Sequence, residues 1–386
     1  MAISDDPKIA FVGWNPFQFL HFQKLAARFD HPTFVLEERN KADKVFDFNS
    51  ILTTPHQVLA CTRKEMRALD GKFDVLVCQT QFEGIEEIRK SRIAMLQYGY
   101  AKESHNFGCW RSFADVCMTF GAYASDRMSP FCPCVAIGNP RYEEWDLPHF
   151  HKTARDAYQG QLDPRKKTIL YAPTWGGLSS YKKFADAISS LSDEFNIIIK
   201  IHHNSQRAGA KFLQSVSKKF AVTCDARHDI VALLSISDLL ISDYSGALFD
   251  AIYCRVPVVL LQSLTDSNLD LHSLERSRGA EIGELIHSPS QLASGVHRAF
   301  NQTALSIDSL TKLRNDLFLD PTHASMTARK VLLDLAGGCY KPTLEQLAIR
   351  EEMRERNRRR NHHPTLRRIR NLLAKSVKSI QRQFGG

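Results

Sequence analysis

Short runs of apolar, often β-branched residues alternate with helical patterns along most of this chain, and this alternation limits the folds open to it. It is typical of a parallel sheet whose strands are joined by crossover helices. We therefore predict an α/β chain in which two Rossmann-like, doubly wound domains face a cleft. The predicted strands are residues 8–12, 33–36, 74–77, 93–96, 116–119 and 134–137 in the first half, and 168–171, 196–199, 221–223, 238–241 and 256–260 in the second.

A polar, charged stretch at residues 150–167 separates the two halves and is the predicted linker. The predicted domains are an N-terminal Rossmann-like domain, 1–150, a C-terminal Rossmann-like domain, 151–340, and a basic tail, 341–386. Ligands of open parallel sheets bind beyond the carboxyl ends of the strands, so we expect the functional residues just after strands. No GxGxxG run follows the first strand and no GxxxxGK(S/T) run is present, which argues against classical dinucleotide binding and P-loop hydrolysis.

The excess positive charge is concentrated in the tail. Residues 341–386 hold 13 Lys or Arg and 4 Asp or Glu, an excess equal to the net charge of +9 of the whole chain. Beyond Pro364, apolar residues recur at three- and four-residue steps with basic residues on the other face, which predicts a basic amphipathic helix over 364–384. Such a helix binds an anionic membrane surface. The alternatives are packing on the protein body and nucleic-acid binding; because the tail lacks interleaved aromatic residues, we expect no nucleic-acid partner.

Two absences guide the expected location and chemistry. No run of about 18 apolar residues is present, and residues 1–7 resemble no signal peptide, so we expect a cytoplasmic protein, peripheral on the inner face of the cell membrane. The nine cysteines include no CxxC pair, and Cys132-Pro-Cys134 has poor spacing for zinc. We expect no cofactor and no metal ligands, although Asp243 and Asp250 leave metal dependence open.

Two segments of the second half carry polar residues directly after predicted strands. Residues 197–201 run into His202 and His203, where an imidazole acts as a general base, neutralises a phosphate, or is merely structural. Ser245 and Gly246 open a helix and would offer a hydroxyl and backbone N–H groups to an anion. The alternative is a cap that satisfies only its own helix, because Ser is a preferred cap.

Two more segments add weaker signals. Thr174 and Trp175 precede a glycine turn that allows close backbone approach. The run Glu275-Arg-Ser-Arg278-Gly279 places two cations beside an acid, either as a solvated loop or as a clamp on phosphate and ribose.

Taken in order, these segments resemble the CDP-glycerol glycerophosphotransferase family, which includes teichoic-acid primases and polymerases. The resemblance implies a GT-B architecture, a donor site for a cytidine diphosphate conjugate in the C-terminal domain, and a membrane-facing acceptor site in the N-terminal domain. The matching segments are Thr168–Trp175, Lys200–His202, Ile241–Ser245, Phe249-Asp250, Pro257 and Arg278-Gly279.

The resemblance also implies roles for single residues. His202 looks like the family's donor-domain histidine, and Gly138-Asn-Pro-Arg141 is similar to its Gly-x-Pro-Arg signature. Ser242, Asp243 and Ser245 look like its phosphate-binding turn. The expected substrate-binding residues are Lys102, Arg141, Thr174, Trp175, Lys200, His203, Ser242, Asp243, Ser245, Gly246, Glu275, Arg278 and Gly279.

The sequence departs from the family pattern in the N-terminal domain. The usual Trp-His-Gly run followed by a lysine reads Gln97-Tyr-Gly-Tyr-Ala-Lys102, with Tyr98 in the histidine position. The expected catalytic residues are therefore Tyr98, His105 and His202, unless a loose phosphoryl transition state needs little help from a base. Gly246 and His203 stand where a serine and a proline are common, so another nucleotide donor fits the same skeleton.

These observations predict an enzyme of cell-surface glycopolymer synthesis. It would transfer glycerol phosphate, or a similar polyol phosphate, from CDP-glycerol or a related nucleotide donor to a hydroxyl of a lipid-linked acceptor, releasing CMP. The first alternative is a GT-B glycosyltransferase that uses a nucleotide sugar in lipopolysaccharide or capsule assembly. The second is a scaffold or RNA-binding protein that acts through its basic tail.

Overall fold

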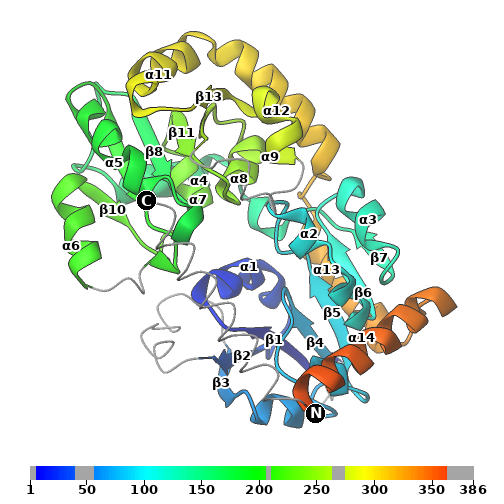
Figure 1. Ribbon diagram of the computed structural model, residues 1–386. Helices are drawn as coiled ribbons and strands as arrows, with labels where there is room; N and C mark the ends of the chain where they lie inside the picture. Colours follow the sequence, from blue (N-terminus) through cyan, green and yellow to red (C-terminus); the bar gives the residue numbers. More distant parts are fainter. Residues whose placement is uncertain (1–5, 40–55, 206–209, 263–273, 363–386) are drawn as a thin grey trace, which may run out of the picture.

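Two lobes, each built on a parallel sheet, make up the computed structural model, which describes residues 6–39, 56–205, 210–262 and 274–362 (Figure 1). The first sheet has the order β3-β2-β1-β4-β5-β6-β7 and the second the order β10-β9-β8-β11-β12-β13. All pairings in both sheets are parallel. The order 3-2-1-4-5-6 is that of a doubly wound Rossmann sheet, so the predicted α/β class and both Rossmann-like sheets are confirmed.

The strands have the following bounds: β1 (Ile9–Gly13), β2 (Thr33–Glu38), β3 (Gln57–Thr62), β4 (Val75–Cys78), β5 (Arg92–Leu96), β6 (Val116–Thr119), β7 (Cys134–Ala136), β8 (Thr168–Ala172), β9 (Asn196–Lys200), β10 (Val222–Cys224), β11 (Leu239–Ser242), β12 (Val258–Leu261) and β13 (Glu284–Ile286). Each predicted strand is present, with its ends shifted by at most two residues. The sequence analysis missed β3 and β13. Both lie at sheet edges, where a strand is short or half exposed and its apolar signal is weak.

The α-helices have the following bounds: α1 (Pro16–Ala26), α2 (Glu103–Asn106), α3 (Ala122–Met128), α4 (Pro148–Ala157), α5 (Tyr181–Ser189), α6 (Ala210–Lys219), α7 (Ile230–Leu234), α8 (Ala247–Cys254), α9 (Leu274–Ser277), α10 (Gly279–Ile282), α11 (Leu292–Asn301), α12 (Thr303–Leu317), α13 (Ala324–Ala336) and α14 (Leu344–His362). Helices cover the sheets, so the central strands β1, β4, β8 and β11 are buried at every position. The stretch predicted as a linker begins within α4, which packs against α7.

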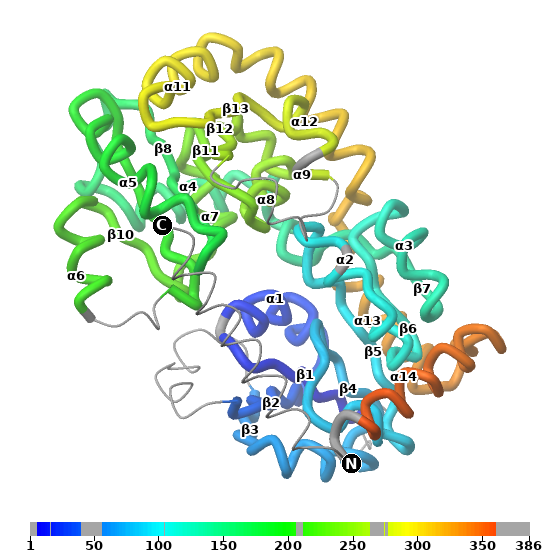
Figure 2. The backbone as a smooth tube through the Cα atoms, in the orientation of Figure 1, coloured from blue at the N-terminus to red at the C-terminus, as the bar shows by residue number. Residues whose placement is uncertain are grey.

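The chain returns to the first lobe after completing the second. Helix α12 lies against α8 and α3, and α13 then packs on β4, β5 and β6 of the first sheet (Figure 2). The crossing is close, because a Cβ at Gly121 would lie 2.2 Å from the Leu317 carbonyl oxygen. Residues 324–336, which fall within the predicted second domain, therefore belong by packing to the first lobe.

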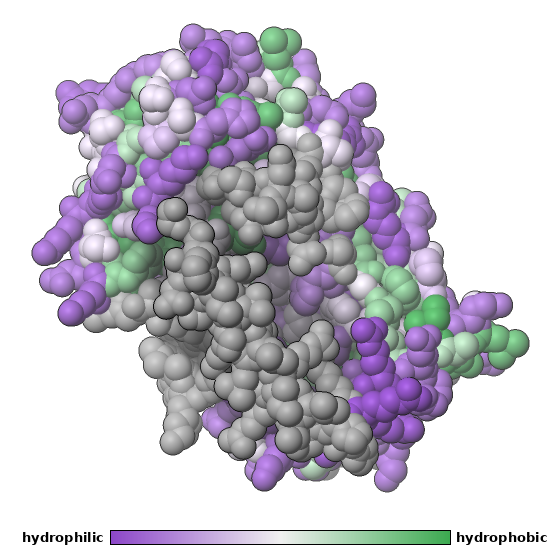
Figure 3. Space-filling model, viewed as in Figure 1, coloured by the Kyte–Doolittle hydropathy of each residue, from purple (hydrophilic) through white to green (hydrophobic). Residues whose placement is uncertain are grey.

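The first part of the predicted tail is a helix docked on the first lobe. Arg350 of α14 is buried and donates to the Ala114 carbonyl at 2.6 Å and to Asp115 at 3.0 Å. Hydrophilic side chains gather over the C-terminal half of α14 (Figure 3), whereas Leu344 and Leu347 at its start are exposed. The predicted amphipathic helix, 364–384, lies outside the described residues. Within the described ranges, no helix is both long and apolar enough to cross a bilayer.

Candidate functional site

A cavity of about 310 Å³ lies between the two lobes, where the carboxyl ends of both sheets meet. From the first lobe it is lined by residues that follow β1 and β5, and from the second by residues that follow β8, β9 and β11. The structure brings most predicted site residues together here. Those in the cavity wall are Tyr98, Lys102, His105, Arg141, Thr174, Trp175, Lys200, His202, His203, Ser245 and Gly246.

Ser242 and Asp243 do not reach the cavity wall, contrary to the expected direct contact with phosphate. The Ser242 hydroxyl donates to the Ala172 carbonyl at 2.6 Å. The Asp243 carboxylate accepts the backbone N–H groups of Thr174 and Ser180, each at 2.8 Å. Burial raises the pKa of Asp243 to about 6, against these hydrogen bonds, which lower it. Both residues therefore fix the turn after β8, which carries Thr174, rather than a ligand.

The segment predicted to clamp the nucleotide also lies away from the cavity. Arg278 pairs with Glu281 at 2.8 Å and with Asp316 at 3.1 Å, and Gly279 packs beneath Leu285 and Leu260. Neither lines the cavity, which corrects the expectation for both. The side chain of Glu275 is outside the described part of the structure.

His202 is held as a neutral hydrogen-bond donor. Its Nδ1 accepts the Asn204 backbone N–H at 3.1 Å, and its ring stacks on His203 at 4.1 Å. Burial, with the neighbouring charges of His203 and Lys102, lowers the pKa of His202 to about 2. Because Nδ1 is occupied as an acceptor, the proton of the neutral ring lies on Nε2. In this state the Nε2–H is available to donate a hydrogen bond, and the Nδ1 lone pair is already engaged by the Asn204 N–H.

Aromatic side chains connect the lobes across the cavity. The His203 ring is parallel to that of Phe17 in the first lobe, with centroids 6.1 Å apart. The Trp175 ring stacks on His202 with a centroid separation of 6.1 Å, and Trp175 is 45% exposed. Trp175 therefore offers a face on which a planar group such as a nucleobase can stack.

Lys200 lies deeper in the second lobe. Its Nζ donates to the Asp225 carbonyl at 2.8 Å. Burial lowers the pKa of Lys200, although the Asp229 carboxylate opposes this shift. An anion bound in the cavity would favour the charged form of this lysine.

The turn after β7 aims Arg141 across the boundary between the lobes. Gly138 has a φ of +79°, a conformation that favours glycine. A Cβ at this position would lie 3.0 Å from backbone atoms of Asp320 and Pro321, in the segment that connects α12 to α13. The Asn139 side chain then accepts the Arg141 N–H at 3.2 Å and caps the turn. Local backbone requirements thus explain the Gly-Asn-Pro-Arg run.

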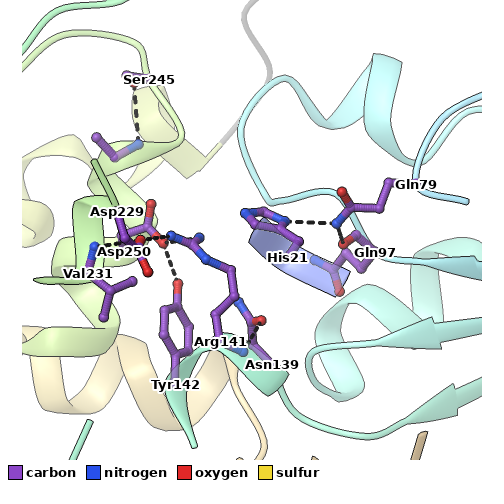
Figure 4. Close-up of polar contacts among 11 residues, drawn as sticks. His21, Gln79, Gln97, Asn139, Arg141, Tyr142, Asp229, Val231, Ser245 and Asp250 are labelled. Atoms are coloured by element: carbon purple, nitrogen blue, oxygen red, sulfur yellow. Dashed lines mark hydrogen bonds and ion pairs between the residues drawn. The ribbon is translucent and has the colours of Figure 1, made fainter. Parts of the chain in front are cut away.

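Arg141 is already paired with carboxylates of the second lobe (Figure 4). Its guanidinium contacts Asp229 at 2.6 Å and Asp250 at 3.2 Å, and Asp250 also accepts from the Tyr142 hydroxyl at 2.6 Å. Burial would raise the pKa of Asp229, but Arg141 and the Val231 N–H hold it below its usual range. Burial raises the pKa of Asp250, whose contact with Arg141 is longer. Arg141 therefore acts first as a link between the lobes.

The three expected bases differ in their environments. Burial raises the pKa of Tyr98 to about 12, so its phenolate is not available near neutral pH. His105 is exposed at the surface, yet desolvation by neighbouring atoms and the charges of Lys102 and Arg111 lower its pKa. Lys102 has a φ of +57°, an uncommon backbone conformation that non-glycine residues adopt mainly at turns and functional sites.

The sequence analysis missed His21, on α1 just after β1. Its ring is 3% exposed and lines the cavity, and its Nδ1 lies 2.8 Å from Gln79 Nε2 (Figure 4). Burial and the charge of Arg141 lower its pKa well below the usual range. The available signal was a histidine on the first helix after the first strand. The family motifs lie at the ends of strands in the second half, so they do not point to this residue.

No group of three or more His, Cys, Asp or Glu side chains in the described ranges could hold a metal ion.

A family model matches a segment that begins at β7 of the first sheet and includes β8 to β12 of the second. Residues 133–267 match the family model of CDP-Glycerol:Poly(glycerophosphate) glycerophosphotransferase. A teichoic acid poly(glycerol phosphate) polymerase of Bacillus spizizenii is 32% identical over 108 residues, which are 25% of this chain and 27% of the polymerase. The alignment thus spans about a quarter of that relative's length. The resemblance stated from the sequence is confirmed: this segment carries the domain of that family.

Solved structures agree on the fold. The wall teichoic acid polymerase TagF superposes with a TM-score of 0.60 at 16% identity, covering 86% of this chain and 89% of that one. A TagF variant soaked with CDPG gives a TM-score of 0.60 at 15% identity, covering 86% and 90% of the two chains. A UDP-N-acetylglucosamine 2-epimerase follows at 0.54 and 15% identity, covering 86% and 96%. The predicted two-lobed GT-B architecture is confirmed.

Proposed function

We propose that this chain transfers glycerol phosphate, or a similar polyol phosphate, from a CDP-linked donor to a hydroxyl group of a lipid-linked acceptor, and releases CMP. One observation carries this proposal: the segment that matches the glycerophosphotransferase family supplies Thr174, Lys200, His202 and Ser245 to one wall of the cavity between the lobes. The CDPG soak of the TagF variant supports the same donor class.

The second lobe suits a diphosphate. Helix α8 begins at Ala247 with Ser245 and Gly246 in the cavity wall, so its N-terminal end faces the ligand space. The helix dipole favours an anion there. Lys200 supplies a positive charge, and the Nε2–H of His202 supplies a hydrogen bond, while Trp175 offers a stacking surface for the base.

The proposed reaction is a displacement at phosphorus. The acceptor oxygen forms a bond to the glycerol-bearing phosphorus, the bond from that phosphorus to the CMP oxygen breaks, and CMP leaves with the electron pair. The acceptor proton passes to water or to His105, the expected base whose ring is exposed. Positioning and neutralisation of charge carry most of the rate enhancement in such transfers.

The acceptor would enter from the first lobe, on the side of Tyr98 and Lys102. We place the protein on the cytoplasmic face of the cell membrane, held by the basic sequence 364–384 on anionic lipid. The docked part of the tail, α14, continues directly into this sequence.

A donor screen tests the proposal. The purified chain is incubated with CDP-glycerol, CDP-ribitol, UDP-sugars and GDP-sugars, each with a glycerol-phosphate oligomer or lipid-linked acceptor, and the released nucleotide is identified by mass. We expect CMP from a CDP-polyol, and thermal stabilisation by the same donor. Release of UDP or GDP from a nucleotide sugar would instead support the glycosyltransferase, which shares the epimerase-like fold.

A further inference from the structure

Among the buried side-chain atoms of the cavity wall that lack a hydrogen-bond partner in the described ranges is a histidine ring nitrogen. Nε2 of His21 forms no hydrogen bond within the described part of the chain, although the residue is only 3% exposed. Leaving a buried donor or acceptor unsatisfied costs about 1–3 kcal/mol. Because His21 lines the cavity, a bound ligand can supply the missing partner.

The neighbours of His21 define which ring nitrogen carries the proton. Gln79 Nε2 lies 2.8 Å from His21 Nδ1 and 3.1 Å from the Gln97 carbonyl oxygen. A carbonyl oxygen only accepts, so the amide nitrogen, not the amide oxygen, of Gln79 must face it. The same amide group therefore donates to Nδ1, and the proton of the neutral imidazole lies on Nε2.

The position of the ring is also fixed. The Phe17 ring packs against the imidazole with a centroid separation of 4.1 Å. Figure 4 shows His21 between Gln79 on one side and the Arg141 cluster on the other, with Ser245 on the facing lobe. Nε2–H is thus directed into the space between the lobes rather than into the core of the first lobe.

The surroundings favour an anionic oxygen as its partner. Lys102, Lys200 and Arg141 line the same cavity, and Arg141 already engages the carboxylates of Asp229 and Asp250. The N-terminal end of α8 adds a partial positive charge. An N–H donor in such a site pairs well with a phosphoryl oxygen.

We propose that His21 is a catalytic residue whose Nε2–H donates a hydrogen bond to a non-bridging oxygen of the phosphoryl group in transfer. This inference rests on the proposed function. His21 keeps its proton throughout; it stabilises the phosphoryl oxygens from the first lobe while α8 and His202 act from the second. Gln79 is a positioning residue, because it holds the tautomer without facing the ligand.

Two substitutions of similar size separate this role from packing. His21→Gln keeps an amide N–H near the position of Nε2, whereas His21→Asn keeps an acceptor for Gln79 but has no group near Nε2. We expect His21→Asn to lower kcat by about 100- to 1000-fold, as for loss of one oxyanion donor, and His21→Gln to stay within about tenfold of the wild type. The donor KM should change less than kcat in both. Equal losses in the two variants, or a wild-type kcat for His21→Asn, would overturn the proposal.

A second measurement does not depend on turnover. In wild-type protein labelled with ¹⁵N-histidine, with His21 assigned by comparison with His21→Gln, we expect one protonated nitrogen, Nε2, and one unprotonated nitrogen, Nδ1. Inorganic pyrophosphate should shift the Nε2–H signal. A proton on Nδ1, an imidazolium, or no response to saturating pyrophosphate contradicts the inference.

The two proposals fail in different ways. If the wild type releases no CMP from any CDP-polyol, the proposed function is wrong, and the same pair of variants is compared with the donor that the mass screen identifies. If the wild type releases CMP and the two variants lose equal activity, only the role of His21 is wrong.

Discussion

The Arg141 guanidinium in the first lobe lies 2.6 Å from the Asp229 carboxylate in the second, beside the cavity that the two lobes enclose. Asp250 adds a further contact at 3.2 Å. The cavity wall therefore contains its own interlobe ion pair, and the lobes are held by buried charge as well as by apolar contacts.

Removing that guanidinium should weaken the whole protein. Arg141→Ala leaves Asp229 and Asp250 without their cation, and breaking a buried pair destabilises a protein by about 3–5 kcal/mol. Urea unfolding followed by circular dichroism measures this loss. Arg278→Ala is the matched control, because its pairs with Glu281 and Asp316 are partly exposed and contribute at most about 1 kcal/mol. Equal losses for the two variants would contradict the structural role of Arg141.

His202→Ala should lower turnover by about 100-fold or more, because the cavity loses the donor Nε2–H. Steady-state release of CMP measures the effect. The matched control is His297→Ala, since His297 is exposed and pairs with Glu194 at 3.5 Å. Full activity of His202→Ala would show that the nucleotide substrate does not bind against the end of β9.

Tyr98→Phe should leave kcat within about threefold and the pH profile unchanged. The burial that raises the pKa of Tyr98 to about 12 leaves almost no phenolate at neutral pH, so the hydroxyl is a poor general base. The measurement is kcat between about pH 6 and pH 9, because the pKa of a general base usually lies near neutral pH. If kcat of the wild type rises with pH and this rise is absent in Tyr98→Phe, Tyr98 acts as the base after all.

Asp243 should make stability depend on pH in the acid range. Its pKa rises from 3.8 to about 6 on folding. Between pH 3.8 and about pH 6 the folded state therefore keeps a proton that the unfolded state has already released. The contribution of Asp243 is therefore largest below pH 3.8 and is lost as the pH rises through about 6. The shift of about two units corresponds to about 3 kcal/mol.

The difference in unfolding free energy between wild type and Asp243→Asn isolates this effect. We expect that difference to fall as the pH rises from about 4 to about 6, the window between the unfolded and folded pKa values of Asp243. Asparagine does not titrate, so the variant shows no such change. A constant difference would show that Asp243 is ionised throughout.

Truncation after His362 should remove membrane binding without unfolding the body. Arg350 anchors α14 on Ala114 and Asp115, so this helix must be kept, whereas the basic sequence beyond it is deleted. We expect the truncated chain to lose co-sedimentation with anionic vesicles and to retain turnover on a water-soluble acceptor. Loss of both activities would favour packing of that sequence on the body.

The strands could be predicted from the sequence because a buried parallel strand has a short continuous run of apolar residues. β8 and β11 are buried at every residue and were placed to within one residue. β3, at a sheet edge, alternates exposed and half-buried residues and gave no such signal. The motif order also placed Lys200, His202 and Ser245 at the cavity, because the carboxyl ends of neighbouring parallel strands share one edge of the sheet.

What the sequence could not decide was the direction of each side chain and the partners that it meets. Ser242 and Ser245 are three positions apart, yet the Ser242 hydroxyl donates to the Ala172 carbonyl inside the sheet, whereas Ser245 lies in the cavity wall. His21 and Gln79 are 58 positions apart in the chain and meet only because β1 and β4 pair. Local sequence determines which segments become strands and helices, through their apolar pattern. Only tertiary packing decides which polar atoms are satisfied inside the protein and which are left facing the ligand space, because that depends on contacts between residues distant in the chain.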